Sequence, residues 1–257
     1  PGLSAWGRVA DYRTYQLSQK ANVETYLASK LDAAQILEFG FENICIATGS
    51  HWRADGVSRQ HVVPMPMHPA MPVFTPDDLM AGRLPSGKVT VYDDDHYYMG
   101  GVLAELLVQK GCDVTLVTPS AYVSDWTNNT LEQAEIHKRL VLMGVDIQLN
   151  RGVVAGGDGS LTTNCTYTGL TREQPADAVV MVASRRSDDG LYKDLKAREA
   201  EWQDAGIKSV RLIGDANAPG PIAWATYAGH RFARELDGED IGDALPFRRE
   251  IAELAAD

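Results

Sequence analysis

The feature that most constrains the fold is the regular alternation of short apolar runs with longer segments of helical spacing. Several of the apolar runs end at glycine or at a small polar residue, as in Ala47-Thr48-Gly49 and Ile213-Gly214-Asp215. Strands that alternate with helices are typical of a parallel sheet covered by helices. The pattern therefore predicts an α/β fold.

The expected elements follow from this alternation and from helix-capping signals. The predicted strands are residues 23–27, 43–48, 89–92, 114–118, 145–149, 178–183 and 209–213, with an antiparallel excursion at 161–167. The predicted helices are residues 11–20, 32–39, 75–82, 98–110, 131–143, 191–202 and 222–236. A proline- and methionine-rich stretch, 64–72, is expected to be a crossing linker, and 246–257 a short charged tail.

Composition excludes several classes of protein. The chain has 257 residues, of which 44% are hydrophobic, and a net charge of −11, so it can bury a core and repels nucleic acid and anionic membranes. No apolar run approaches the roughly 20 residues that span a bilayer, and the first residues lack a signal-peptide pattern. The three cysteines are widely spaced and predict neither a disulfide framework nor a metal site. We expect a cytoplasmic protein with neither nucleic-acid nor membrane partners.

Two strand ends carry the signal for a ligand. Open α/β sheets bind ligands at the carboxyl ends of their strands, and a glycine there lets the backbone approach the ligand closely. A carboxylate such as Asp215 accepts hydrogen bonds from ribose or ribityl hydroxyls, and the amides at the start of the helix from 222 face a phosphate. Taken singly, each strand end also fits an ordinary strand-to-loop transition. The candidate cofactor-binding residues are Thr48, Gly49, Gly214, Asp215, Ala216, Pro221 and Ile222.

Together the motifs point to a family. The Ala47-Thr48-Gly49 strand end, an inserted βαβ domain and the later Gly214-Asp215 strand end resemble the two-domain nucleotide-binding flavoproteins related to glutathione reductase. Nearly the whole chain is similar to the C-terminal region of trimethylamine and dimethylamine dehydrogenases, with histamine dehydrogenase a near relative. The segments that carry this resemblance are 1–6, 11–13, 92–99, 195–199, 213–216 and 229–231, with Trp52 three residues after Gly49.

The resemblance implies two Rossmann-like dinucleotide-binding domains of glutathione-reductase type. The first, residues 1–85 and 191–257, is expected to be an incomplete FAD/ADP-binding-like domain that holds ADP or FAD. The second, residues 86–190, is expected to be an inserted NAD-binding-like domain. The first glycine-rich strand, turn and helix of the FAD-like domain are absent, so the chain is expected to be a C-terminal fragment.

The family also implies partners outside the chain. Its members have an N-terminal barrel with covalently attached FMN and a 4Fe-4S cluster, and a barrel alone takes roughly 250 residues. They oxidise an amine at the flavin and pass electrons through the cluster to an electron-transferring flavoprotein. We therefore expect the segment to be noncatalytic, to pack with its own barrel, and to belong to a homodimeric parent enzyme.

The inserted domain has an altered dinucleotide fingerprint. Alignment of its helix with the G-x-G-x-x-G pattern places the three glycine positions at Asp95, Tyr97 and Gly100, so only the packing glycine remains. Tyr97 is bulky where pyrophosphate must approach, and the carboxylates at 93–95 repel it. The following strand ends Val117-Thr118-Pro119, without the acidic residue that binds ribose. The sequence predicts a domain that no longer binds NADH or NADPH.

Other chemistry finds little support. Asp93, Asp94, Asp95 and His96 suggest a metal, but consecutive residues cannot all face one ion, and negative charge suits a helix N-terminus; no metal ligand and no catalytic residue are assigned. Two further functions stay open: part of an NAD(P)H-dependent flavin oxidoreductase resembling dienoyl-CoA reductase, and a docking surface for the electron-transferring flavoprotein. With an open sheet edge, residues 1–75 and 207–257 are expected to be less stable than the inserted domain.

Overall fold

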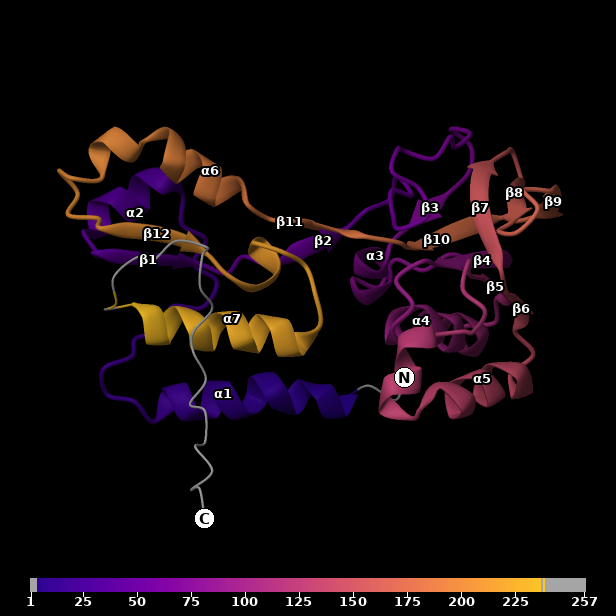
Figure 1. Ribbon diagram of the computed structural model, residues 1–257, viewed down its shortest axis with the longest axis horizontal. Helices are drawn as coiled ribbons and strands as arrows, with labels where there is room; N and C mark the ends of the chain where they lie inside the picture. Colours follow the sequence, from indigo (N-terminus) through magenta and orange to yellow (C-terminus); the bar gives the residue numbers. More distant parts are fainter. Residues whose placement is uncertain (1–3, 237, 239–257) are drawn as a thin grey trace, which may run out of the picture. The chain divides into compact units, whose positions relative to one another are not determined.

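The computed structural model describes residues 4–236 and residue 238, so the expected tail at 246–257 lies outside the described residues. The chain is a mixed α/β protein with parallel strands, which confirms the predicted α/β class (Figure 1). It divides into two compact units. The larger comprises residues up to 28 and 51–186, and the smaller comprises 29–50 and the residues from 187 onward.

A five-stranded parallel sheet forms the centre of the larger unit (Figure 1). Its strands, in spatial order, are β3 (Val73–Phe74), β10 (Ala178–Val182), β4 (Lys88–Asp93), β5 (Asp113–Val117) and β6 (Asp146–Gln148). The order changes direction between β4 and β10, because the chain runs from β4 through β5 to β6 on one side and returns to β10 on the other. In open α/β sheets such a reversal is where ligands bind.

Each face of this sheet buries its own apolar cluster because side chains alternate along a strand. Val89 and Val91 of β4 pack with Leu103 and Leu107 on one face. The helices there are α3 (Pro76–Met80), α4 (Tyr98–Gln109) and α5 (Gln133–Leu142), preceded by the short helix η2 (Asp125–Thr130). The predicted strands and helices between 88 and 118 are confirmed to within one or two residues.

The other face is covered by an antiparallel sheet and by the stretch at 64–72. The antiparallel strands are β7 (Arg151–Gly156), β8 (Ser160–Cys165) and β9 (Thr171–Pro175). Met65 and Met71 are buried there beside Tyr92 and Met181. The stretch therefore contributes to the core, whereas the sequence suggested only a crossing linker. These contacts, and the pairing of β3 with β10, place 51–85 in the larger unit rather than in the domain formed by 1–85 and 191–257.

The smaller unit is built on two parallel strands, β1 (Asn43–Ile46) and β12 (Ser209–Leu212). Helices α2 (Ala33–Phe39) and α6 (Gly190–Ala197) cover one face, where Ile36, Ile46 and Leu195 are buried together (Figure 1). Short helices η3 (Glu199–Glu201) and η4 (Gly214–Ala216) precede and follow β12. Helix α7 (Ile222–Glu235) lies along the other face, but none of its residues is buried.

The N-terminal part contains the clearest error of the sequence analysis. It forms η1 (Ser4–Gly7) and α1 (Arg8–Ser18), but the predicted strand at 23–27 is absent and that prediction is wrong. Tyr26 and Leu27 are 75% and 86% exposed, so this short apolar run neither pairs with a strand nor packs. A strand needs a partner for its backbone groups, and the sequence alone does not supply one.

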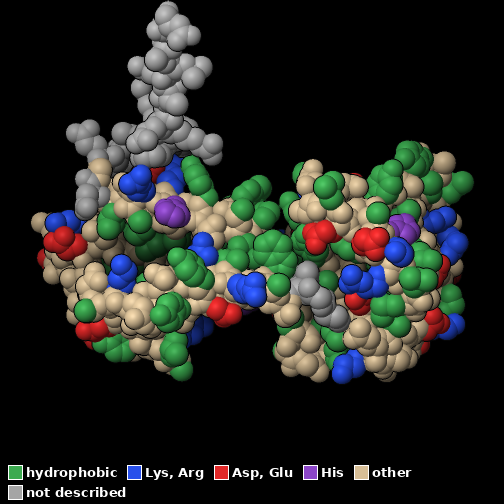
Figure 2. Space-filling model, turned by 90° about the horizontal axis from the view of Figure 1, so that it is seen from below, with side chains coloured by type: hydrophobic (Ala, Val, Ile, Leu, Met, Phe, Trp, Pro, Cys, Tyr) green, Lys and Arg blue, Asp and Glu red, His purple; other side chains and the backbone are tan. Residues whose placement is uncertain are grey.

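The chain crosses between the units at 28–29 and then in two short strands. These strands, β2 (Ser50–Trp52) and β11 (Arg185–Ser187), pair with each other. Apolar side chains remain exposed on both units, and charged side chains of both signs are interspersed among the apolar ones on each unit (Figure 2). Among the described residues, no helix has the length and apolar character required to cross a membrane.

Candidate functional site

The predicted cofactor-binding residues all lie in the smaller unit, at the carboxyl ends of its two strands. Ile46 of β1 pairs with Leu212 of β12, so the segments that leave these strands start side by side. The amide of Ile213 donates to the carbonyl of Ile46 at 3.0 Å, which extends the pairing by one step. Thr48 and Gly49 follow one strand, and η4 with Asp215 follows the other.

Two glycines turn the chain sharply at these strand ends. The φ angles of Gly49 and Gly214 are +86° and +56°, a region that side chains disfavour. A Cβ on Gly214 would lie 3.6 Å from the Cβ of Ala225, which shows how closely the start of α7 approaches this turn. Ala216 is fully buried in the same turn. At these two glycines no side chain stands between the backbone and a ligand, which allows the close contact that nucleotide binding requires.

Asp215 holds the loop that leads into α7. Its Oδ2 accepts from the hydroxyl of Ser50 at 3.1 Å, and its Oδ1 accepts from the amide of Gly220 at 3.1 Å. Its carbonyl accepts from the hydroxyl of Ser187 at 2.9 Å. These contacts hold the Asp215 carboxylate, which only accepts hydrogen bonds when it is ionised, at the carboxyl end of β12.

A second set of contacts fixes the end of β1. The hydroxyl of Thr48 donates to the carbonyl of Asp188, and the amide of Asp188 donates to the carbonyl of Gly49 at 3.0 Å. The segment 187–188 thus contacts both strand ends. Four residues that make these contacts were not predicted from the sequence: Ser50, Ser187, Asp188 and Gly220. Only Ser50 and Gly220 had a signal, since each adjoins a motif already chosen.

The start of α7 presents backbone amides near this turn. Pro221 is extended, and no side chain caps the helix; its carbonyl accepts from the amide of Trp224 at 2.9 Å. Ile222, the first helical residue, is 46% exposed. The first amides of a helix lack partners within the helix and favour an anion. The site therefore combines glycine turns, one carboxylate and a helix start, which suits a nucleotide.

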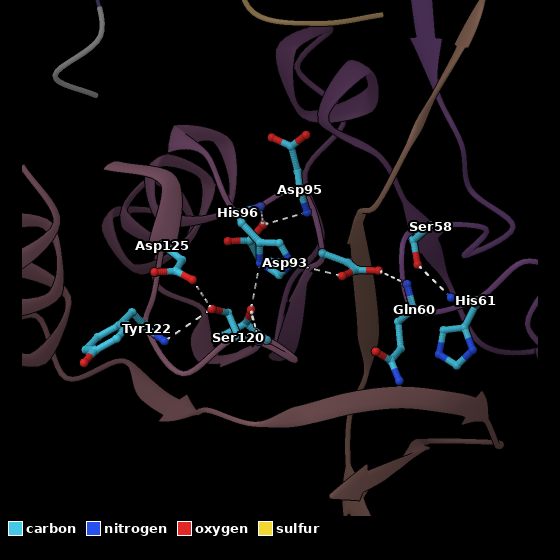
Figure 3. A network of polar contacts seen from close by, with 11 residues as sticks. Ser58, Gln60, His61, Asp93, Asp95, His96, Ser120, Tyr122 and Asp125 are labelled. Carbon is cyan, nitrogen blue, oxygen red and sulfur yellow. Dashed lines mark hydrogen bonds and ion pairs between the residues drawn. The ribbon is translucent and has the colours of Figure 1, made fainter. Parts of the chain in front are cut away.

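The altered fingerprint in the larger unit forms a polar network of its own (Figure 3). Asp93, the last residue of β4, is fully buried. Its Oδ1 accepts from the amides of Asp95 at 3.2 Å and His96 at 3.0 Å. Burial raises the pKa of Asp93 to about 7, against the opposing effect of the His96 amide and charge. Asp93 therefore binds the loop before α4 and not the first turn of the helix, where the sequence analysis expected its charge to act.

Asp94 and His96 connect this loop to two other segments. Asp94 Oδ1 lies 3.1 Å from His96 Nε2, and its Oδ2 accepts from the amide of Gln60 at 2.8 Å. His96 Nδ1 lies 3.3 Å from the Thr118 hydroxyl. Burial opposes charge on His96, but the hydrogen bond to Asp94 and the neighbouring carboxylates outweigh it and raise its pKa.

Aromatic and cationic groups lie over the start of α4. The rings of Tyr97 and Trp126 stack, with centroids 5.7 Å apart and planes within 5°. The guanidinium of Arg59 lies 5.7 Å from the Trp126 ring centroid. Among the described residues, no cluster of three or more His, Cys, Asp or Glu side chains is arranged to hold a metal ion.

The chain is similar to known proteins over most of its length. Residues 74–156 match the family described as the OYE-like second alpha/beta domain. The chain is 35% identical to dimethylamine dehydrogenase of Hyphomicrobium sp. (strain x), over 97% of this chain and 37% of that protein.

Two solved structures are also similar. Histamine dehydrogenase from Rhizobium sp. 4-9 is 66% identical, with a TM-score of 0.94, over 100% of this chain and 40% of that one. The 6-hydroxypseudooxynicotine amine oxidase from Pseudomonas geniculata N1 is 42% identical, with a TM-score of 0.82, over 88% of this chain and 34% of that one. The chain thus spans less than half of each relative. The chain is therefore a close homologue of the C-terminal part of dimethylamine and histamine dehydrogenases.

Proposed function

We propose that the chain is the noncatalytic, nucleotide-holding part of an amine dehydrogenase, and that its smaller unit holds ADP or a related adenine nucleotide. The observation that supports this most directly is the convergence of Gly49, Gly214, Asp215 and the uncapped start of α7 at adjacent strand ends. The relatives that cover most of this chain include two named amine dehydrogenases, which supports the enzyme class.

In this proposal each residue has a limited role. The turns at Gly49 and Gly214 admit the nucleotide close to the backbone, and the amides at Ile222 and beyond face its phosphates. Asp215 accepts from a ribose or ribityl hydroxyl while Ser50 and Gly220 keep its carboxylate in place. The buried Ala216 fixes the turn. Thr48 and Pro221 position the two loops.

The redox chemistry belongs to the parent enzyme. We propose that an N-terminal barrel carries FMN and a 4Fe-4S cluster, that an amine is oxidised at the flavin, and that electrons leave through the cluster to an electron-transferring flavoprotein. The same proposal makes the parent a cytoplasmic homodimer and makes the barrel a partner of this segment. In it, the two units are an incomplete FAD/ADP-type domain and an inserted domain that has lost its nicotinamide cofactor.

The identity of the nucleotide is tested by denaturing the purified parent protein and analysing the released small molecules by mass spectrometry. We expect ADP in about one equivalent per chain. Release of FAD, together with bleaching of the flavin spectrum by NADH, would support an NAD(P)H-dependent flavin oxidoreductase instead and overturn this proposal. Absence of any adenine nucleotide would leave a docking surface as the better description.

The loss of the nicotinamide cofactor is tested separately by titrating NADH and NADPH into the 257-residue chain and recording the heat of binding. We expect no saturable binding of either. Micromolar affinity for one of them contradicts the proposal for the larger unit and leaves the proposal for the smaller unit untouched.

A further inference from the structure

We propose that the Asp93 carboxylate is the built-in occupant of an anion cradle before α4, and that it thereby excludes dinucleotides from the larger unit. The inference deepens the proposed loss of the nicotinamide cofactor and rests on it. In this view the pyrophosphate position of the fingerprint is occupied by the Asp93 side chain, and its amides remain in use. The class of ligand excluded is the pyrophosphate group of a dinucleotide.

The Asp93 carboxyl group lies at the edge of the sheet where a ligand is expected. Asp93 ends β4 where the strand order reverses, between β4 and β10, so it lies where an open α/β sheet receives its ligand. Its Oδ1 accepts from the amide of His96 at 3.0 Å and shares the amide of Asp95, which also lies 3.2 Å from the carbonyl of Val182. The fingerprint alignment places these two amides at the glycine-rich turn.

The loop between β4 and α4 has a backbone conformation that suits anion binding. His96 has a φ of +66°, a left-handed conformation that is uncommon for a residue other than glycine. Turns that combine right- and left-handed residues point successive amides at one spot and bind anions. His96 supplies the left-handed residue of such a turn, and the amides of Asp95 and His96 both donate to Asp93 Oδ1, so the loop forms an anion cradle although two of the three fingerprint glycines are replaced. The bond from the His96 amide to Asp93 offsets the strain of this conformation.

The Asp93 side chain packs closely against Gly100. Gly100, the remaining fingerprint glycine, faces the carboxyl group: a Cβ there would lie 2.5 Å from Asp93 Cγ. The second oxygen, Oδ2, is buried and has no hydrogen-bond partner among the described residues. An unsatisfied buried oxygen is costly, so the carboxyl group is held here by its other contacts rather than by solvent. Gly100 thus leaves room for the occupant.

Other side chains and the segment 58–61 contact the loop that forms the cradle. Asp94 accepts from the amide of Gln60 at 2.8 Å and pairs with His96, which ties the segment at 58–61 to the loop (Figure 3). Tyr97 stacks on Trp126, with Arg59 beside that ring. A pyrophosphate would have to displace both the carboxylate and these contacts.

The test follows the amide resonances of Asp95 and His96 in the 257-residue chain by nitrogen-proton NMR while inorganic pyrophosphate is added, above the Asp93 pKa of about 7. In Asp93→Ala we expect saturable shifts of both resonances and an affinity at least about tenfold above that of the wild type, because the amides lose their internal acceptor. Sodium chloride at equal ionic strength controls for general salt effects.

Asp93→Asn is the matched control. Its side-chain oxygen still accepts from both amides, so we expect no response, as in the wild type. An equal response of wild type and Asp93→Ala, a folded Asp93→Ala without response, or a response of Asp93→Asn equal to that of Asp93→Ala each overturns the inference. Because the readout is local, binding in the smaller unit shifts the amides of Gly49 and Gly214 instead and is told apart. Saturable NADH binding by the wild type would overturn the underlying proposal as well.

A measurement on the wild type alone covers the case in which Asp93→Ala does not fold. We expect the His96 amide to exchange slowly with solvent and its resonance to move with the titration of the Asp93 Cγ resonance. The charged neighbours are Asp94, Asp95 and His96, with Arg59 and Arg185 near Asp95. An amide that exchanges as rapidly as an open loop, or that ignores the Asp93 titration, contradicts the inference.

Discussion

Asp93 and Asp215 are the same residue type and lie at the carboxyl ends of parallel strands, one in each unit, yet their surroundings differ. Asp93 is fully buried and accepts from two amides of its own loop. Asp215 is only partly buried and accepts from Ser50 and Gly220, which come from opposite sides of the turn. We infer that the Asp93 carboxylate occupies the ligand position in the larger unit, whereas the Asp215 carboxylate is available to a nucleotide in the smaller unit.

The proposed role of Asp215 predicts a loss of nucleotide affinity in Asp215→Asn. A hydrogen bond from a ligand hydroxyl to a charged group contributes about 1.5–3 kcal/mol, so we expect roughly tenfold to hundredfold weaker ADP binding by calorimetry. Asp204→Asn is the matched control, because it removes the same charge from an exposed residue before the opposite end of β12. Equal affinities in the two variants would refute the role.

The buried loop of the larger unit predicts a pH dependence of stability. The folded pKa of Asp93 lies near 7 against an ordinary value of 3.8, so the folded state holds the proton more tightly. The stabilisation from that proton is present below about pH 4 and is lost as the pH rises to about 7. His96, with a raised pKa, adds a loss above its ordinary value of 6.5.

We therefore expect the free energy of unfolding, measured by urea denaturation, to fall between about pH 4 and pH 7, and to fall less in Asp93→Asn. Asn cannot ionise and keeps the acceptor for the two amides. Asp177→Asn, which alters a more exposed carboxylate in the same unit, should keep the wild-type slope. A wild-type slope in Asp93→Asn would show that the dependence arises elsewhere.

At the scale of elements, local signals decided how well the sequence predicted the fold. Helix α3 was predicted from Thr75 and Pro76, and the structure shows the full capping box, with Thr75 bonded to Asp78 in both directions. The strand at 23–27 failed because an apolar run indicates a strand only when another strand is available for pairing.

The same distinction holds for the candidate site. Thr48, Gly49 and Gly214 could be chosen because they directly follow apolar strands. Ser187 could not, because its contact with Asp215 joins residues 28 positions apart. The filled cradle was also invisible: a run of carboxylates before a helix suggests surface charge, and only the fold shows that Asp93 turns inward.

The capping boxes give a prediction for each unit. Asp32 caps α2 by accepting from the Gln35 amide at 2.9 Å, and Thr75 caps α3. Replacing either by Ala should cost about 1 kcal/mol of stability in its own unit. Hydrogen exchange resolves the two: we expect Asp32→Ala to raise exchange in α2 and β1 only, and Thr75→Ala in α3 and the strands beside it. Asp32→Asn, which retains the acceptor, is the control.

At the scale of the whole molecule, the two units have unequal cores. The larger buries both faces of a five-stranded sheet, whereas the smaller has two strands and a helix, α7, without a buried residue. Buried apolar contacts set local stability, so the units should open at different free energies.

We expect hydrogen exchange of the 257-residue chain to show weaker protection in β1 and β12 than in β4, β5 and β10, by about a hundredfold or more in rate. Binding of ADP should reduce the difference, since a ligand that binds only the folded state stabilises it. Equal protection in both units without nucleotide would contradict the unequal cores.

The pairing of β2 with β11 has a consequence for engineering and for descent. The chain leaves the smaller unit at Ser50 and re-enters it at Ser187, on strands that already lie side by side. The segment 51–186 therefore begins and ends on two strands that pair with each other. Because residues up to 28 also belong to the larger unit, we expect an exchange of 51–186 for the equivalent segment of a relative to succeed only when those residues are exchanged with it.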